Sequence, residues 1–191
     1  MQPSMDWLAS HGYPLKIDRD NHRRLIVTDE TQSLRVLLVK ASDVPIYVEY
    51  GIADLGIVGR DVILESEADV FEPLALDFGH CRMVVAGKPE DDYESFRLKS
   101  LVRVGTKYPN IARKHFLSKG FQADIIALQG SVELSVTAGL ADVIVDIVET
   151  GITLKQNGLV VHEELFASSA RLIVNKASHK LKFSNIEPFL Q

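Results

Sequence analysis

Short apolar segments that alternate with helix-like segments are the feature that most limits how this chain of 191 residues can fold. Strands that alternate with helices are typical of α/β proteins, in which helices cover a mostly parallel sheet. Hydrophobic periodicity predicts helices at 3–11, 44–50, 60–65, 110–119, 132–138 and 151–157. It predicts strands at 24–28, 34–40, 54–58, 81–86, 102–105, 123–127, 143–147 and 171–174.

Two parts of the sequence repeat a helix end, an Ala-Asp turn and a buried strand. The segment 51–58, GIADLGIV, is similar to the segment 139–146, GLADVIVD. One interpretation is local, because any connection from a helix to a strand favours Gly followed by a polar residue. The other is a pair of similarly built lobes, whose strand ends and loops surround a central cleft. We place lobe I at 1–87 plus 172–191 and lobe II at 88–171.

Composition and charge exclude several classes of protein. The net charge is −5 and the basic residues are scattered, so we expect no nucleic-acid or membrane partner. The sequence has no signal peptide and no apolar stretch long enough to cross a bilayer. Cys81 has no partner for a disulfide, which favours a core role and a cytoplasmic location. The six His residues lack metal-ligand spacing, so we expect no metal held by the protein alone.

The strongest candidate site lies at 133–154, where an apolar strand runs into a loop that opens a helix. Backbone N–H groups at such a position suit a phosphate, and Gly151 allows close approach. The hydroxyls of Thr150 and Thr153 add donors. Asp146 and Glu149 would repel a phosphate, but they suit ribose hydroxyls, directly or through Mg²⁺. These residues favour a phosphorylated sugar; the alternative is that Thr150 only caps the helix and the acids are solvated.

The same segment resembles the signature of ATP phosphoribosyltransferases, and other blocks extend the resemblance over nearly the whole chain. These blocks are 39–51, 53–59, the pair Cys81 and Arg82, and 106–110. The resemblance implies an α/β fold of two lobes with mostly parallel sheets and a central cleft, similar to type II periplasmic binding proteins. It also implies a glycosyltransferase that joins N1 of ATP to C1 of 5-phosphoribosyl 1-diphosphate and releases pyrophosphate with Mg²⁺. This reaction is the first step of histidine biosynthesis.

The resemblance assigns the functional residues to the two lobes. Phosphoribosyl diphosphate is expected on lobe II, at Glu133, Asp146, Glu149, Thr150, Gly151, Ile152 and Thr153. Contacts to ATP phosphates or to the departing pyrophosphate are expected from Arg82, Lys40 and Arg23. Such a reaction needs positioning and charge stabilisation rather than a covalent nucleophile. The alternative for each cation is an ordinary surface residue, and Lys40 stands where Arg is common in the family.

Both ends of the sequence depart from the family's long form. The family usually opens with a strand and a Pro-Lys-Gly-Arg turn that are absent here, so we expect a truncated amino terminus with weak stability and poor activity. The chain ends soon after the strand 171–174, as the short form does. The short form implies a separate regulatory subunit that resembles histidyl-tRNA synthetase, with a homodimer inside a hetero-oligomer. The alternative is an unregulated homodimer.

Two other functions remain open on the residues alone. A non-catalytic solute-binding or effector-sensing domain would share the two-lobed fold. Against it stand the missing export signal, the missing DNA-binding segment and the acid-plus-Thr loop. A phosphoribosyltransferase that acts on a different base is the second alternative. Asp54 and Asp142 we interpret as structural residues that fix the turns entering their strands.

Overall fold

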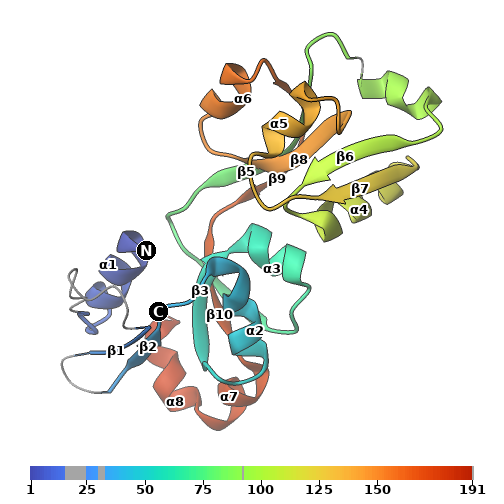
Figure 1. Cartoon of the computed structure of the whole chain (residues 1–191). Coiled ribbons are helices and arrows are strands. Elements are labelled where there is room, and N and C mark those ends of the chain that lie inside the picture. The colour runs from blue at the N-terminus through green and yellow to red at the C-terminus, as the bar shows by residue number, and fades with distance from the viewer. Residues whose placement is uncertain (16–24, 30–32, 92, 191) are drawn as a thin grey trace. The chain divides into compact units, whose positions relative to one another are not determined.

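The computed structural model describes residues 1–15, 25–29, 33–91 and 93–190. These residues form two compact units (Figure 1). Unit 1 contains Met1–Phe78 and Ala170–Gln191, and unit 2 contains Gly79–Ser169. The chain thus passes from unit 1 into unit 2 and back again. The boundaries differ from those placed on the sequence, because strand β5 (Cys81–Gly87) is hydrogen-bonded within unit 2.

Unit 1 is built on a three-stranded antiparallel sheet in the order β3, β10, β4. Helices α2 and α3 pack on this sheet, where Val48, Val58, Ile63 and Ile173 form a buried cluster. A separate two-stranded sheet joins β1 to β2. The elements of unit 1 are α1 (Gln2–Ser10), β1 (Ile26–Thr28), β2 (Arg35–Leu37), η1 (Ala41–Asp43), α2 (Val44–Glu49), β3 (Leu55–Gly59), α3 (Arg60–Ser66), β4 (Phe71–Ala75), β10 (Ala170–Val174), α7 (Lys176–Leu181), α8 (Phe183–Ile186) and η3 (Glu187–Phe189).

Unit 2 is built on a five-stranded sheet in the order β7, β6, β8, β5, β9. One face packs on α4 through a buried cluster that includes Val104, Phe116 and Val145. The other face packs on α5 and α6 through a cluster that includes Val136 and Leu154. The elements besides β5 are η2 (Tyr93–Leu98), β6 (Val102–Thr106), α4 (Pro109–Ser118), β7 (Ala123–Ala127), α5 (Val132–Thr137), β8 (Val143–Val148), α6 (Ile152–Gln156) and β9 (Val160–Ser168). Within the described part of the chain, no helix is long and apolar enough to cross a membrane.

The sheets of unit 1 are antiparallel and the sheet of unit 2 is mixed, so neither unit has a mostly parallel sheet. Strand β6 pairs in parallel with β7 and β8, as expected for strands connected by helices. Strand β5 instead pairs antiparallel with β8 and β9. The reason is the route of the chain, since β5 enters unit 2 from unit 1 and β9 returns to it in the opposite direction. The prediction of mostly parallel sheets therefore holds for β6, β7 and β8 and is corrected for the remaining strands.

The repeated segments 51–58 and 139–146 have the same local structure. Gly51 follows α2 with φ of 71°, and Gly139 follows α5 with φ of 77°. In both segments the glycine N–H donates to the carbonyl three residues earlier, and the next N–H donates to the carbonyl five residues earlier. This pair of bonds is the Schellman helix ending, which favours glycine in the left-handed conformation. The sequence similarity therefore reflects one helix-to-strand connection used once in each unit.

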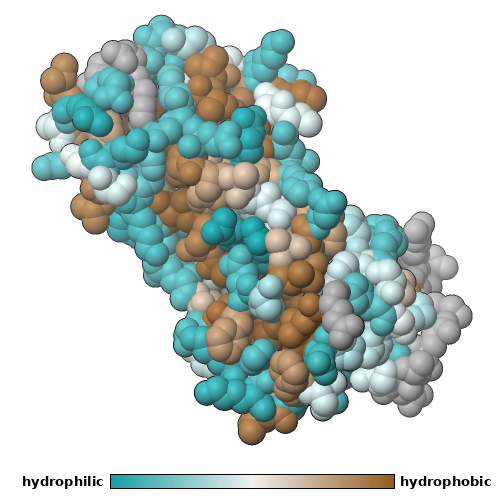
Figure 2. Space-filling model, turned by 180° about the vertical axis from the view of Figure 1, so that it is seen from behind, coloured by the Kyte–Doolittle hydropathy of each residue, from teal (hydrophilic) through white to brown (hydrophobic). Residues whose placement is uncertain are grey.

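Apolar side chains also remain on the surface of both units. Figure 2, seen from behind the view of Figure 1, shows apolar patches between polar ones. Ile46 and Tyr50, one helical turn apart at α2, are 50% and 77% exposed, and Ile52 just after them is 61% exposed. Unit 2 exposes Leu98, Leu117, Leu134 and Ile152. Apolar surface that gathers in this way is typical of contact sites between proteins.

Candidate functional site

The loop of residues 149–151 joins β8 to α6 in unit 2. Gly151 is the N-cap of α6 and has φ of 76°, a conformation that glycine adopts without steric cost. Leu154, only 4% exposed, anchors the first turn of α6 in the core. Thr150 and Thr153 are exposed. Because α6 has only five residues, its dipole is small, so the groups that this loop offers to an anion are individual N–H and hydroxyl donors rather than the helix field.

Asp146 lies on β8, at the end of the sheet from which the loop emerges. It pairs with Val84 of β5, so its side chain is on the sheet face that α5 and α6 cover. Its Oδ1 accepts a hydrogen bond of 2.9 Å from the Ile147 N–H. Burial raises the pKa of the Asp146 carboxyl above its ordinary value, although the Ile147 N–H and the charge of Lys107 act in the opposite direction. A carboxylate that is half-buried at a strand end is typical of a ligand-binding position.

Glu133 is a second predicted site residue, and its charge acts on Asp146. It stands in the first turn of α5, and its negative charge contributes to the raised pKa of Asp146. Lys107, which follows β6, lies near the same carboxyl. The sequence assigned no function to Lys107, although it belongs to the block 106–110. The similarity of this block to the family was the only sign in the sequence that Lys107 has a function. Its position near Asp146 depends on the pairing of β6 with β8.

Arg82 is at the same end of the sheet as the loop. It pairs with Val148, the last residue of β8. Its Nη1 donates to Glu164 Oε2 at 3.0 Å, and both side chains are nearly half exposed. Arg82 begins β5, as expected, but its own side chain is at the surface. Nothing in the sequence indicated Glu164 as its partner.

The other two predicted cations are not in unit 2. Lys40 is an exposed residue of unit 1 that directly precedes η1. Arg23 lies outside the described residues. Their contacts with ATP or pyrophosphate therefore stay predictions.

Asp54 and Asp142 have structural partners, as the sequence predicted. Asp142 Oδ2 accepts a hydrogen bond of 2.8 Å from the backbone N–H of Arg103, and its Oδ1 lies 3.2 Å from Arg103 Nη2. Asp54 accepts hydrogen bonds from the Ser178 hydroxyl and from Lys182. Asp142 thus joins the start of β8 to β6, and Asp54 joins the start of β3 to α7 and Lys182.

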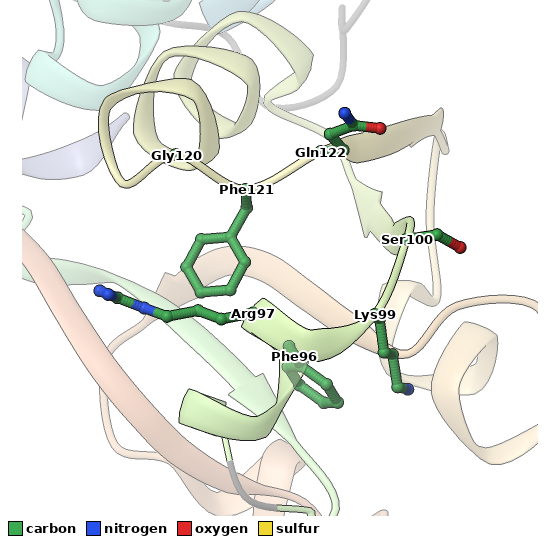
Figure 3. Close-up of a pocket in the computed structure, with 7 residues that line it drawn as sticks. All are labelled: Phe96, Arg97, Lys99, Ser100, Gly120, Phe121 and Gln122. Atoms are coloured by element: carbon green, nitrogen blue, oxygen red, sulfur yellow. The ribbon is translucent and has the colours of Figure 1, made fainter.

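A separate pocket of about 310 Å³ lies between η2 and the end of α4 (Figure 3). In Figure 3 the Arg97 side chain extends below the Phe121 ring, 5.6 Å from its centroid. Lys99 Nζ lies 4.5 Å from the Phe96 centroid and also pairs with Asp142. The aromatic rings are almost fully buried, and the cations are already engaged. None of the predicted site residues lines this pocket.

The chemistry of the carboxylates bears on metal binding. Among the described residues, no group of three or more His, Cys, Asp or Glu side chains could hold a metal ion. Asp146 and Glu133 nevertheless offer carboxylate oxygens, which are the ligands that Mg²⁺ prefers. They fit an ion that is coordinated mainly by a ligand's phosphates and by water, as Mg²⁺ commonly is.

Comparisons with known proteins identify the family of this chain. The model of the ATP phosphoribosyltransferase family (HisG) matches residues 40–191. The ATP phosphoribosyltransferase of Thermoanaerobacter sp. (strain X514) is 52% identical over 179 residues, which cover 94% of this chain and 83% of that protein. In the solved ATP phosphoribosyl transferase (HisG:HisZ) complex from Thermotoga maritima, a chain at 34% identity has a TM-score of 0.86, with 99% of this chain and 89% of that chain covered.

A more distant solved structure shares the fold alone. The structure of Tv2483 bound to L-arginine is 15% identical, with a TM-score of 0.56 over 80% of this chain and 65% of that chain. The family model and the similar relatives cover most of the sequence, so the family of this chain is shown by sequence and does not depend on similarity of fold. This chain belongs to the ATP phosphoribosyltransferase family.

Proposed function

We propose that this chain catalyses the family's reaction with unit 2 as the phosphoribosyl-diphosphate side and unit 1 as the ATP side. The reaction joins N1 of ATP to C1 of 5-phosphoribosyl 1-diphosphate and releases pyrophosphate, as the first step of histidine biosynthesis. The observation that carries the proposal is the position of Asp146 beside the Thr150-Gly151 loop, at the end of β8. Carboxylate acceptors beside neutral phosphate donors suit a phosphorylated ribose.

The loop residues have separate functions in this proposal. Asp146 and Glu149 accept hydrogen bonds from the ribose hydroxyls, with Glu133 beside them. The hydroxyls of Thr150 and Thr153 and the N–H groups of Gly151 and Ile152 hold the 5-phosphate. Gly151 carries no Cβ, so the phosphate can approach its backbone.

Catalysis requires that negative charge on the leaving pyrophosphate be stabilised. Arg82, Lys40 and Arg23 supply positive charge to the pyrophosphate or to the phosphates of ATP. The oxygens of Asp146 and Glu133 would help to hold a Mg²⁺ ion bound to the diphosphate, and that ion would supply charge neutralisation for the leaving group. The protein's own residues bind and orient the substrates and exclude water. None of these residues forms a covalent intermediate.

Incubation with ATP, phosphoribosyl diphosphate and Mg²⁺ tests the proposal, with the absorbance of phosphoribosyl-ATP as the readout. Product that depends on all three additions is the expected result. Failure to form product, with the regulatory partner present and with the chain extended upstream, would reject it. Binding of an amino acid without product formation would instead favour the solute-binding alternative. None of the observations above supports that alternative.

We also propose a homodimer that works with a regulatory subunit in the cytoplasm. Support comes from the solved relative, which is a HisG:HisZ complex, and from the exposed side chains Ile46, Tyr50 and Ile52. The cytoplasm is where substrates of amino-acid biosynthesis are expected. Histidine should inhibit the reconstituted complex and leave the isolated chain unaffected. Inhibition of the isolated chain by histidine would contradict a separate regulatory subunit.

A further inference from the structure

The end of strand β6 brings Lys107 to the level of Asp146 on the neighbouring strand β8. These parallel strands are in register at Thr106 and Val145, so Lys107, which follows the last residue of β6, comes at the level of Asp146, which is still paired within β8. The Thr106 hydroxyl is fully buried and donates to the Val145 carbonyl at 2.6 Å. It also accepts from the Tyr108 N–H at 2.8 Å. One buried hydroxyl thus ties the end of β6 to β8 and fixes the turn that carries Lys107.

Close packing of α5 brings a second carboxylate to this position. A Cβ added to Gly105 of β6 would lie 2.4 Å from Ser135 Oγ and 3.2 Å from Ser135 Cβ. Glycine at this position therefore lets α5 lie directly on β6. Ser135 is held by its own hydrogen bond to the Val132 carbonyl, at 2.6 Å. The first turn of α5, with Glu133, is positioned by this contact.

The three charged groups do not neutralise one another by direct pairing. Lys107 is exposed, and in the described part of the chain no carboxylate is within ion-pair distance of its Nζ. Its charge still favours the ionised form of Asp146, and that of Glu133 disfavours it. Arg82, at the same end of the sheet, is already paired with Glu164. A ligand with several negative charges would meet two carboxylates here, and Lys107 is the amine that can offset them.

We infer that Lys107 is a further catalytic residue, which binds the diphosphate of phosphoribosyl diphosphate. This inference rests on the proposed function. In phosphoribosyl diphosphate the ribose hydroxyls lie between C1, which carries the diphosphate, and C5, which carries the phosphate. With the hydroxyls on Asp146 and the 5-phosphate on the Thr150-Gly151 loop, the diphosphate extends to the opposite side of Asp146, toward Lys107.

The protein's contribution to the step is electrostatic. The bond between C1 and the diphosphate oxygen breaks, and the diphosphate leaves with the electron pair. The lone pair of adenine N1 forms the new bond to C1, and the positive charge on adenine is relieved when its 6-amino group loses a proton to water. Lys107 stays protonated and stabilises charge that grows on the departing oxygens.

Separate binding of the two halves of the substrate tests this assignment. Titration calorimetry would measure the affinity for pyrophosphate with Mg²⁺ and for ribose 5-phosphate, in wild type, Lys107→Met and Lys107→Arg. Loss of one charge-assisted hydrogen bond weakens binding by about 10-fold to 100-fold. Lys107→Met should weaken pyrophosphate binding by that factor and change ribose 5-phosphate binding by less than about 3-fold. Lys107→Arg should restore most of the pyrophosphate affinity.

The matched control is Lys114→Met, which removes an exposed charge farther along α4 and should leave both affinities unchanged. Equal pyrophosphate affinity in Lys107→Met and wild type would overturn the inference while leaving the proposed function intact. Equal weakening of both ligands would also overturn it, because Lys107 would then support the whole site. If wild type binds neither half of the substrate, the proposed function itself fails.

Discussion

Arg82 Nη1 lies 3.0 Å from Glu164 Oε2, and this ion pair joins β5 to β9 beside the end of β8. Both side chains are nearly half exposed, so the pair contributes little to stability, about 0 to 1 kcal/mol. Its geometry holds the guanidinium at the end of the sheet where the loop 149–151 begins. In the proposed function, Glu164 orients Arg82 until the anionic substrate competes for it.

Replacement of Arg82 should separate activity from stability. Arg82→Met should lower kcat/KM for phosphoribosyl diphosphate by about 100-fold, because a charge-assisted contact to phosphate is lost. Its free energy of unfolding should change by less than about 1 kcal/mol. Arg97→Met, which breaks the exposed pair of Arg97 with Glu94, is the control and should leave kcat/KM unchanged. Full activity of Arg82→Met would mean that Arg82 is only a surface residue.

Replacement of Asp146 should raise the stability of the protein and lower its activity. Burial raises the pKa of this carboxyl above the ordinary value of 3.8, so ionised Asp146 opposes folding. The folded state binds the proton of this carboxyl more tightly than the unfolded state does. Protonated Asp146 therefore contributes fully to the free energy of unfolding below pH 3.8, and this contribution is lost as the pH rises through the raised pKa. Asp146→Asn should therefore unfold at a higher urea concentration than wild type at pH 7.5, with less activity.

The difference should shrink as the pH is lowered toward 4, which urea unfolding at several pH values would measure. Asp124→Asn, at an exposed position on β7, is the control and should shift stability by less than about 0.5 kcal/mol at every pH. An Asp146→Asn protein that is less stable than wild type at pH 7.5 would show that hydrogen bonds to the carboxylate outweigh its burial.

Replacement of Gly105 should disturb the packing of α5. The Cβ of Gly105→Ala would meet Ser135 Oγ at 2.4 Å, and such overpacking typically costs about 1 to 3 kcal/mol. The additional change Ser135→Gly removes the contacting atoms and should recover part of the loss. Gly130→Ala, with open space around its Cβ, is the control in urea unfolding. Unchanged stability of Gly105→Ala would contradict the close packing of α5 on β6.

Local sequence patterns were sufficient for much of the fold. The strand 123–127 was predicted with the bounds of β7, and the glycine turns at Gly51 and Gly139 followed from a helix ending that is specified within a few residues. Strands β4 and β9 were missed. β4 is largely exposed, contains Pro73 and lies at a sheet edge, and β9 has two register shifts against β5, so neither has a regular apolar alternation.

Relations between distant strands were the part that the sequence did not reveal. The phosphoribosyl loop is continuous in sequence, so its donors and acids could be read together. Glu164, the partner of Arg82, comes from β9, and Lys107, the neighbour of Asp146, follows the end of β6. Only the pairing of strands in the sheet brings these residues close to each other. The helix after the loop was predicted at 151–157, whereas α6 is Ile152–Gln156, because the end of a helix depends on where the chain leaves it.

The central claim is that the loop after β8 binds the phosphoribosyl group. Its most direct test is kcat/KM for phosphoribosyl diphosphate, at saturating ATP, in the double variant Thr150→Val and Thr153→Val. Thr137→Val, an exposed threonine on α5, is the isosteric control. We predict a loss of about 100-fold or more for the loop variant, since two phosphate donors disappear, and less than 2-fold for the control. Equal kcat/KM in the loop variant and the control would contradict the claim.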